Sequence, residues 1–143
     1  ADALHPLRDA DVLTLARLQI TAGAPAVAAS RLRRVLRGGA EPGVAATARR
    51  LLLGLRRPDL ERDLETAGKS AVDADMARAA DAEAAFERVL AAEPDLWEAH
   101  FGRGLLAWQR GDADAAQASF QRAMDLNPAA AELLSDLGRT VEN

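Results

Sequence analysis

The segment Ala67-Gly68-Lys69-Ser70 is the part of the sequence that most resembles a nucleotide site, because phosphate-binding loops end in Gly-Lys-Ser. In such a loop the backbone amides hold the phosphates, while the Lys and Ser side chains reach phosphate and metal. The loop also needs a glycine five residues before its final Gly-Lys, where this chain has Asp63, and an apolar strand in front of it. We therefore interpret the segment as part of a helix.

Three pairs of aspartates have a spacing that could serve a hard cation or acid–base chemistry. They lack the twelve-residue calcium loop with its glycine and terminal glutamate, and each pair precedes an apolar stretch of helical periodicity. Carboxylates at such places cap helix starts and meet the positive end of the helix dipole. We predict this capping role, rather than a metal site, for Asp9/Asp11, Asp73/Asp75 and Asp112/Asp114.

The remaining residue types leave little for catalysis. The chain has no cysteine, which excludes disulfides, a thiol nucleophile and Cys-ligated metal sites. Its two histidines, His5 and His100, have no second ligand at helical spacing, and we predict a structural or solvated role for both. No serine has an obvious base near it in the sequence. We expect no catalytic residue, no metal, no cofactor and no enzymatic activity.

Composition narrows the fold class. The 143 residues suffice for one domain, about a quarter of them are Ala, and strand-forming residues are scarce, so an all-β fold is excluded. There is no apolar run of membrane-spanning length. We expect a soluble protein from the cytoplasm, with a mature periplasmic or exported protein left open. The first residue is Ala1, which suits a processed chain or a piece of a longer one.

Charge is distributed unevenly along the chain. Residues 1–60 carry ten Arg against five acids, whereas residues 61–143 carry eight bases against seventeen acids. A solvated helix face is the interpretation we favour for the arginines, with an acidic protein partner as the alternative. Nucleic acid is disfavoured because no aromatic residue lies among them for base stacking and the acidic half would repel the polymer. The arginines cluster at Arg31, Arg33, Arg34 and Arg37, and at Arg49, Arg50, Arg56 and Arg57.

Residues 95–128 predict a pair of helices. Asp95 is placed to cap a helix whose apolar face includes Trp97, Phe101, Leu105 and Trp108. Gly111 ends that helix within Arg110-Gly111-Asp112, and a second helix runs from there to the Asn127-Pro128 dipeptide. The inward residues of the second helix are Ala116, Phe120, Ala123 and Met124.

This unit resembles a tetratricopeptide repeat (TPR). The family pattern asks for small residues at positions 8 and 20, an aromatic at 24, Ala at 27 and Pro at 32. Counted from Trp97, these positions hold Gly104, Ala116, Phe120, Ala123 and Pro128. The sequence departs from the pattern at Arg103, where Leu is usual, and at Ala107, where Tyr is usual, so we expect looser packing of the first helix.

The same spacing recurs 34 residues earlier, at Ala82, Phe86, Val89 and Pro94. A repeat must stack on neighbours to bury its apolar face, so recurrence strengthens the resemblance. We divide the chain into a degenerate repeat at 9–42, an extra helix at 43–57, a repeat with a long turn at 59–94, the clearest repeat at 95–128 and a capping helix at 129–143. The resulting fold is an all-α, right-handed superhelix of about three helix pairs.

The middle of the chain allows two pairings. In the one we favour, the helix that starts near Leu60 pairs with the helix that contains Phe86. In the other, residues 43–57 pair with 59–68, and residues 70–77 form a stunted helix.

The TPR resemblance implies a concave groove that binds a protein segment. In that family, positions 2, 5, 9 and 12 of each first helix line the groove. On this chain they are Glu98, Phe101, Leu105 and Trp108, with Ala10, Leu13, Arg17 and Ile20 in the first repeat and Arg62, Glu65, Lys69 and Val72 in the middle one. The Lys and Asn with which some members bind an acidic C-terminus are replaced by Phe101 and Leu105. The alternative is that Trp97, Phe101, Leu105 and Trp108 belong to the core.

We therefore predict a non-catalytic module of bacterial type that binds a protein or peptide in its groove, as an adaptor or scaffold in a larger assembly. Self-association between the basic and acidic halves of two copies is the first alternative. Binding of nucleic acid through the Arg-rich half is the second.

Overall fold

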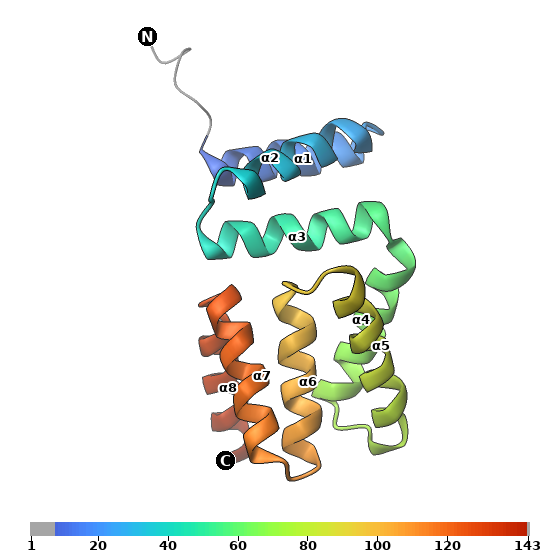
Figure 1. Ribbon diagram of the computed structural model, residues 1–143, viewed down its shortest axis with the longest axis vertical. Coiled ribbons are helices and arrows are strands. Elements are labelled where there is room, and N and C mark those ends of the chain that lie inside the picture. Colours follow the sequence, from blue (N-terminus) through green and yellow to red (C-terminus); the bar gives the residue numbers. More distant parts are fainter. Residues whose placement is uncertain (1–7, 143) are drawn as a thin grey trace.

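The computed structural model describes residues 8–142, and every regular element in that range is a helix (Figure 1). The expected all-α fold is confirmed. No helix in this part of the chain has the length and apolar character of a membrane span. The elements are α1 (Asp9–Thr21), α2 (Pro25–Arg37), α3 (Pro42–Arg56), α4 (Pro58–Val72), the short 3-10 helix η2 (Met76–Arg78), α5 (Ala79–Ala92), α6 (Trp97–Gln109), α7 (Ala113–Leu126) and α8 (Ala130–Glu142).

Local sequence signals place several helix ends. Three helices start at a proline, whose missing amide is not needed in the first turn: α2, α3 and α4. Gly111, at φ +82°, stops α6, and the Asp112 carboxylate then accepts a hydrogen bond from the Ala115 amide at 3.1 Å. The predicted turn between α6 and α7 is therefore present.

Three other predicted caps are wrong. The Asp95 carboxylate does not cap α6 but binds Arg122 of α7 at 2.8 Å. Asp73 pairs with Lys69, and Asp75 pairs with Arg78. Each of these carboxylates binds a nearby cation, and Asp73 lies at the carboxy-terminal end of α4, where carbonyls rather than amides are free.

Aromatic rings packed on glycines set the spacing of α5, α6 and α7. Phe86 of α5 is fully buried, and its ring occupies the space that a Cβ atom at Gly102 of α6 would need. Phe120 of α7 lies against Gly104 in the same way, with its ring 2.6 Å from the position of a Cβ atom there. The backbones of α5 and α6, and those of α6 and α7, can approach each other closely because the glycine at each contact has no side chain.

Helix α3 packs on two sides. Leu52 belongs to a core shared by α1, α2 and α3, in which Leu13 and Leu32 are buried. The next residue, Leu53, belongs to a second core with Leu60 and Phe86. Figure 1 shows α3 running across the ends of the upright α4 and α6, with α1 and α2 on its other side. Helix α3 therefore joins the two cores.

Helices α4 and α5 pack against each other as an antiparallel pair, and η2 lies in the turn between them. Helix α4 continues without a break to Val72. The turn has no glycine, and Ala74 takes a positive φ of 54° instead. The assignment of these helices to successive repeats remains our prediction.

We expect Gly102→Ala to lower the free energy of unfolding by about 1–3 kcal/mol, because the added methyl group must displace the buried Phe86 ring. Gly68→Ala is the matched control, since nothing lies within 4 Å of a Cβ atom at that helical position. It should raise the free energy of unfolding by up to about 1 kcal/mol through helix propensity. Urea unfolding followed by circular dichroism measures both changes, and equal effects would contradict the contact.

Candidate functional site

The residues whose types could suit a nucleotide or metal site lie in helices or bind the backbone. Gly68, Lys69 and Ser70 lie inside α4, as expected for a helical segment. The His100 ring contacts the Pro94 carbonyl through Nε2 at 2.8 Å. No group of three or more acids or histidines with metal-binding geometry occurs among the described residues. His5 lies outside them, as does the side chain of Asp9.

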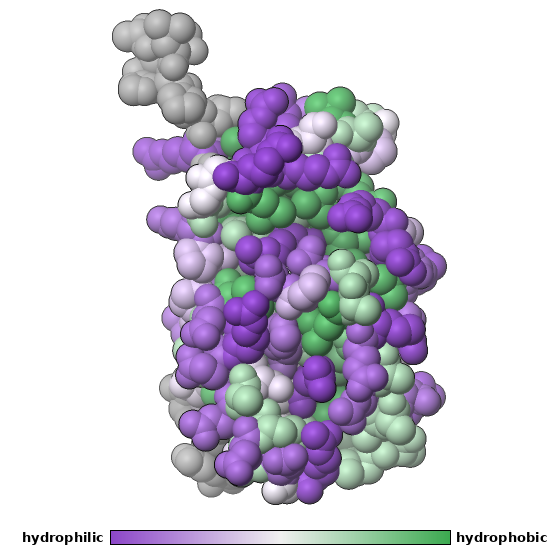
Figure 2. All heavy atoms as spheres, in the orientation of Figure 1, coloured by the Kyte–Doolittle hydropathy of each residue, from purple (hydrophilic) through white to green (hydrophobic). Residues whose placement is uncertain are grey.

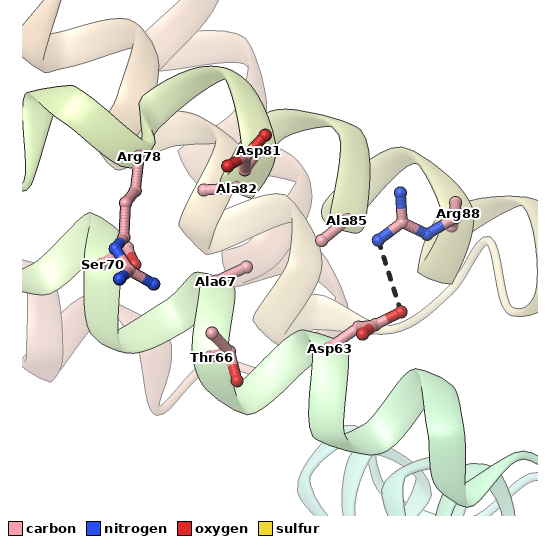
Figure 3. Close-up of a pocket in the computed structure, with 9 residues that line it drawn as sticks. All are labelled: Asp63, Thr66, Ala67, Ser70, Arg78, Asp81, Ala82, Ala85 and Arg88. Carbon is pink, nitrogen blue, oxygen red and sulfur yellow. Dashed lines mark hydrogen bonds and ion pairs between the residues drawn. The ribbon is translucent and has the colours of Figure 1, made fainter.

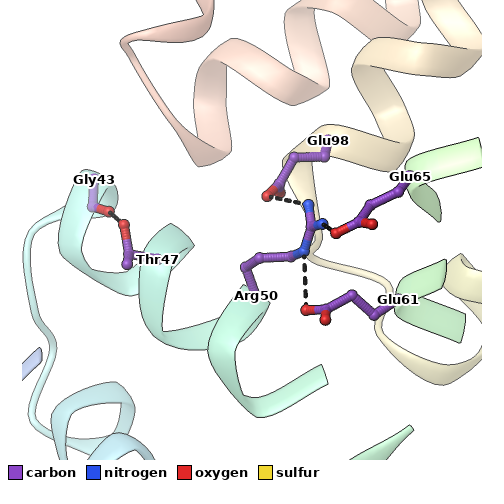
Figure 4. A network of polar contacts seen from close by, with 6 residues as sticks. All are labelled: Gly43, Thr47, Arg50, Glu61, Glu65 and Glu98. Carbon is purple, nitrogen blue, oxygen red and sulfur yellow. Dashed lines mark hydrogen bonds and ion pairs between the residues drawn. The ribbon is translucent and has the colours of Figure 1, made fainter. Parts of the chain in front are cut away.

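Arg50 of α3 is the centre of a polar cluster (Figure 4). Its Nη1 donates to Glu98 of α6 at 3.3 Å, and its Nη2 donates to Glu65 of α4 at 3.2 Å. Its Nε donates to Glu61 of α4 at 3.5 Å. The Glu61 carboxylate lies against Gly54, where a Cβ atom would be 2.5 Å from Oε2. One guanidinium thus holds three carboxylates from two helices.

Glu98 is the most enclosed of these carboxylates, with 21% of its side chain exposed. Its Oε1 is buried without a hydrogen-bond partner. Burial raises the pKa of Glu98 above its usual value, because the charged form loses water, and Arg50 offsets part of this effect. Glu98 was predicted to line the groove, but its carboxylate is occupied by Arg50.

The other predicted groove residues of α6 differ in accessibility. Phe101 is buried, with its ring 5.3 Å from that of Phe120 and 6.0 Å from that of Trp97. Its burial agrees with the core interpretation, because the Phe120 ring of α7 packs on it. Leu105 is half-buried between two cores. Trp108 is 61% exposed and available to a partner.

The predicted groove residues of α1 are not brought next to those of α6. Helix α1 packs on α2 and α3, and Figure 1 shows α3 between α1 and the upright helices. Leu13 is buried in the first core, Ile20 packs at the edge of that core, and Arg17 is exposed. Helix α3 therefore lies between the two sets of predicted groove residues.

Helices α4 and α6 are neighbours at their carboxy-terminal ends. The Gln109 side chain donates from Nε2 to the Ala71 carbonyl at 2.6 Å. In the sequence, Val72 follows Ala71 and Trp108 precedes Gln109, and both side chains are exposed. Met76 of η2 is exposed as well. We call Val72, Met76, Leu105 and Trp108 the α4–α6 face. Sequence reasoning missed Met76, because the pattern of first-helix positions does not extend into the turn.

The repeat positions have the burial that their packing role requires. Gly104, Ala82, Phe86, Val89, Ala116, Phe120 and Ala123 are buried, whereas Pro94 and Pro128 are exposed beyond helix ends. Gly102, which sequence reasoning missed, is buried with them. Its signal was present as a second glycine two residues before Gly104.

A groove of about 220 Å³ lies on the surface where α4 and α5 meet (Figure 3). Ala67, Ala82 and Ala85 face one another across it, and Arg88 binds Asp63 at 3.3 Å. Arg78 and Asp81 complete the charged lining. Two cations and two anions leave this groove without a net charge that would attract a ligand.

Arg50→Ala should lower the free energy of unfolding by about 1–3 kcal/mol near neutral pH, because three carboxylates then face one another without a cation. The loss should shrink as the pH falls towards the usual range of glutamate, where protonation relieves the repulsion. Urea unfolding at several pH values measures the change. A loss that does not depend on pH would contradict the electrostatic explanation.

Glu98→Gln provides the complementary measurement. Because the pKa of Glu98 is raised in the folded chain, its stabilising contribution is complete below the unfolded pKa and is lost as the pH rises through the folded pKa. The uncharged variant should therefore gain stability relative to the natural chain as the pH rises over this window. The same urea series would show the opposite trend if Arg50 dominated the pKa of Glu98.

Comparison with protein families finds a tetratricopeptide repeat model that matches residues 73–131 and, in a second match, residues 104–141. The matches cover α5, α6, α7 and nearly all of α8, including both aromatic–glycine contacts. Helices α1 to α4 lie outside them, so the degenerate repeat at 9–42 remains a prediction. Comparisons with curated proteins and with solved structures gave no match. Residues 73–141 of this chain therefore belong to the tetratricopeptide repeat family.

Proposed function

We propose that the chain is a non-catalytic adaptor whose α4–α6 face binds a segment of another protein. Tetratricopeptide repeats generally mediate interactions between proteins, and the matched residues supply part of this face. The observation that carries the proposal is the exposure of Trp108 and Val72, which adjoin in the sequence the hydrogen-bonded pair Gln109 and Ala71. In the repeat numbering both residues occupy position 12 of a first helix, a position that lines the groove in this family.

Trp108 is suited to dominate the binding energy of such a face. Trp is among the residues that most often contribute large shares of binding energy at protein interfaces. The indole is on a helix fixed by the buried Phe101 and by the Gln109 bond to α4, so little backbone entropy is lost when a partner covers it. The side chain is therefore both accessible and held on a rigid element.

The chemistry of the face favours an apolar contact. Besides Trp108, the face consists of Val72, Met76 and Leu105, which carry only aliphatic and thioether groups. The carboxylate at the other end of α6, on Glu98, already binds Arg50. We infer that the partner segment contributes apolar side chains to Trp108 and Val72.

Trp108→Ala should weaken binding by about tenfold or more, because it removes the largest exposed apolar group of the face. The free energy of unfolding should change by less than about 0.5 kcal/mol, since the side chain is mostly in solvent. Peptides selected from a display library against the natural chain provide the ligands, and calorimetric titration provides the affinities. Affinity capture from a lysate of the native cell, with both chains in parallel, then identifies the natural partner.

Leu18→Ala is the matched control, because Leu18 of α1 is also 61% exposed but lies outside the α4–α6 face. It should leave the affinity of the selected peptides unchanged. Equal binding by the natural chain and the Trp108 variant would refute the proposal, and so would global unfolding of the Trp108 variant.

A further inference from the structure

Most arginines of the first three helices, unlike most cations of the later helices, have no carboxylate partner among the described residues. Helices α1, α2 and α3 contain eight arginines, and of these Arg50 alone forms an ion pair among the described residues. None of the other seven arginines pairs with a described carboxylate. We call these seven the basic face: Arg17, Arg31, Arg33, Arg34, Arg37, Arg49 and Arg56.

In the rest of the described chain, most cations are paired with carboxylates. Most of the Lys and Arg residues between positions 58 and 126 pair with carboxylates, as Arg88 does with Asp63 and Arg122 does with Asp95. The difference has a simple cause, because the carboxylates of the chain are concentrated after residue 60. Figure 2 shows hydrophilic side chains over the layer formed by α1 and α2. Within the described residues this layer therefore presents positive charge that no described carboxylate neutralises.

Two apolar residues are exposed in the same layer. Leu18 near the end of α1 and Val27 near the start of α2 are both largely in solvent. They lie at the same end of the α1–α2 pair, on either side of the short turn at residues 22–24. At this end Arg17 adjoins Leu18 in α1, and Arg31 lies one helical turn after Val27 in α2, so a ligand that covers it would meet aliphatic and guanidinium groups together.

We propose that the basic face binds an acidic protein segment in which carboxylates alternate with apolar side chains. Guanidinium groups bind carboxylates through paired, charge-assisted hydrogen bonds. The apolar residues of such a segment would cover Leu18 and Val27. The face is formed by α1, α2 and α3, so this binding is separate from that of the α4–α6 face.

A protein segment fits these observations better than a nucleic acid. The three Phe and two Trp residues all lie in α5, α6 and α7, so none is interleaved with the arginines of α1, α2 and α3 for stacking on bases. Leu18 and Val27 offer nothing to a phosphate backbone. A long polyanion would also meet the acidic remainder of the chain, which a short segment would avoid.

The test uses fluorescein-labelled probes and the full chain. One probe is a peptide of repeated Glu-Glu-Leu units, and the other is a single-stranded DNA of equal charge. Fluorescence anisotropy at low and at physiological salt gives the affinities. The variant Arg33→Ala/Arg37→Ala removes two exposed, unpaired arginines of α2, and Arg34→Ala/Arg56→Ala serves as a second variant if the first fails to fold.

The matched control is Arg88→Ala/Arg122→Ala, which removes the same charge from paired positions outside the basic face. We expect the peptide to bind the natural chain, to bind the control with little change, and to bind the basic-face variant about tenfold more weakly. Trp108→Ala should retain peptide binding, so failure of the α4–α6 face would not affect this result.

Three results would overturn the proposal. The first is absence of peptide binding at low salt. The second is an equal loss of affinity in the basic-face variant and in the control, which would show an effect of net charge alone. The third is tighter binding of the DNA than of the peptide.

Discussion

The close approach of helices at Gly102 and Gly104 is the constraint on which the α5–α7 region depends. Each glycine admits an aromatic ring to a space where any other residue would place its Cβ atom. Phe86 and Phe120 thereby bury their rings between helices that are otherwise rich in Ala. Small residues let the backbones approach, and two large rings supply much of the apolar surface that leaves water.

The second constraint is electrostatic and acts between the two cores. Arg50 reaches from α3 to carboxylates on α4 and α6, so one side chain connects the basic part of the chain to the acidic part. Leu52 and Leu53 supply the apolar half of the same connection, because adjacent residues of a helix point to different sides. The orientation of α3 thus depends on both the Arg50 ion pairs and the packing of Leu52 and Leu53.

Sequence reasoning was most successful where the signal is local or periodic. The spacing of 34 residues identified Phe86 and Phe120 because each ring packs within its own region of the chain. It failed for Phe101 and Trp108, which share one helical stripe yet differ in burial. That difference arises from α7, whose Phe120 ring packs on Phe101 while Trp108 stays exposed, and no pattern within α6 reports it.

The position of α1 could not be predicted for a related reason. Leu13, Arg17 and Ile20 follow the spacing of a first helix, but the direction in which that helix lies is set by α3. The contacts of α3 join residues far apart in the sequence, such as Arg50 and Glu98. Periodicity within one segment carries no information about such pairs.

The transverse course of α3 also limits what the α4–α6 face can hold. Helix α6 has 13 residues and is therefore about 20 Å long. An extended strand of protein laid along it would span that distance with about six residues. If the α4–α6 face binds a protein segment as we propose, a short linear motif has the dimensions that fit it.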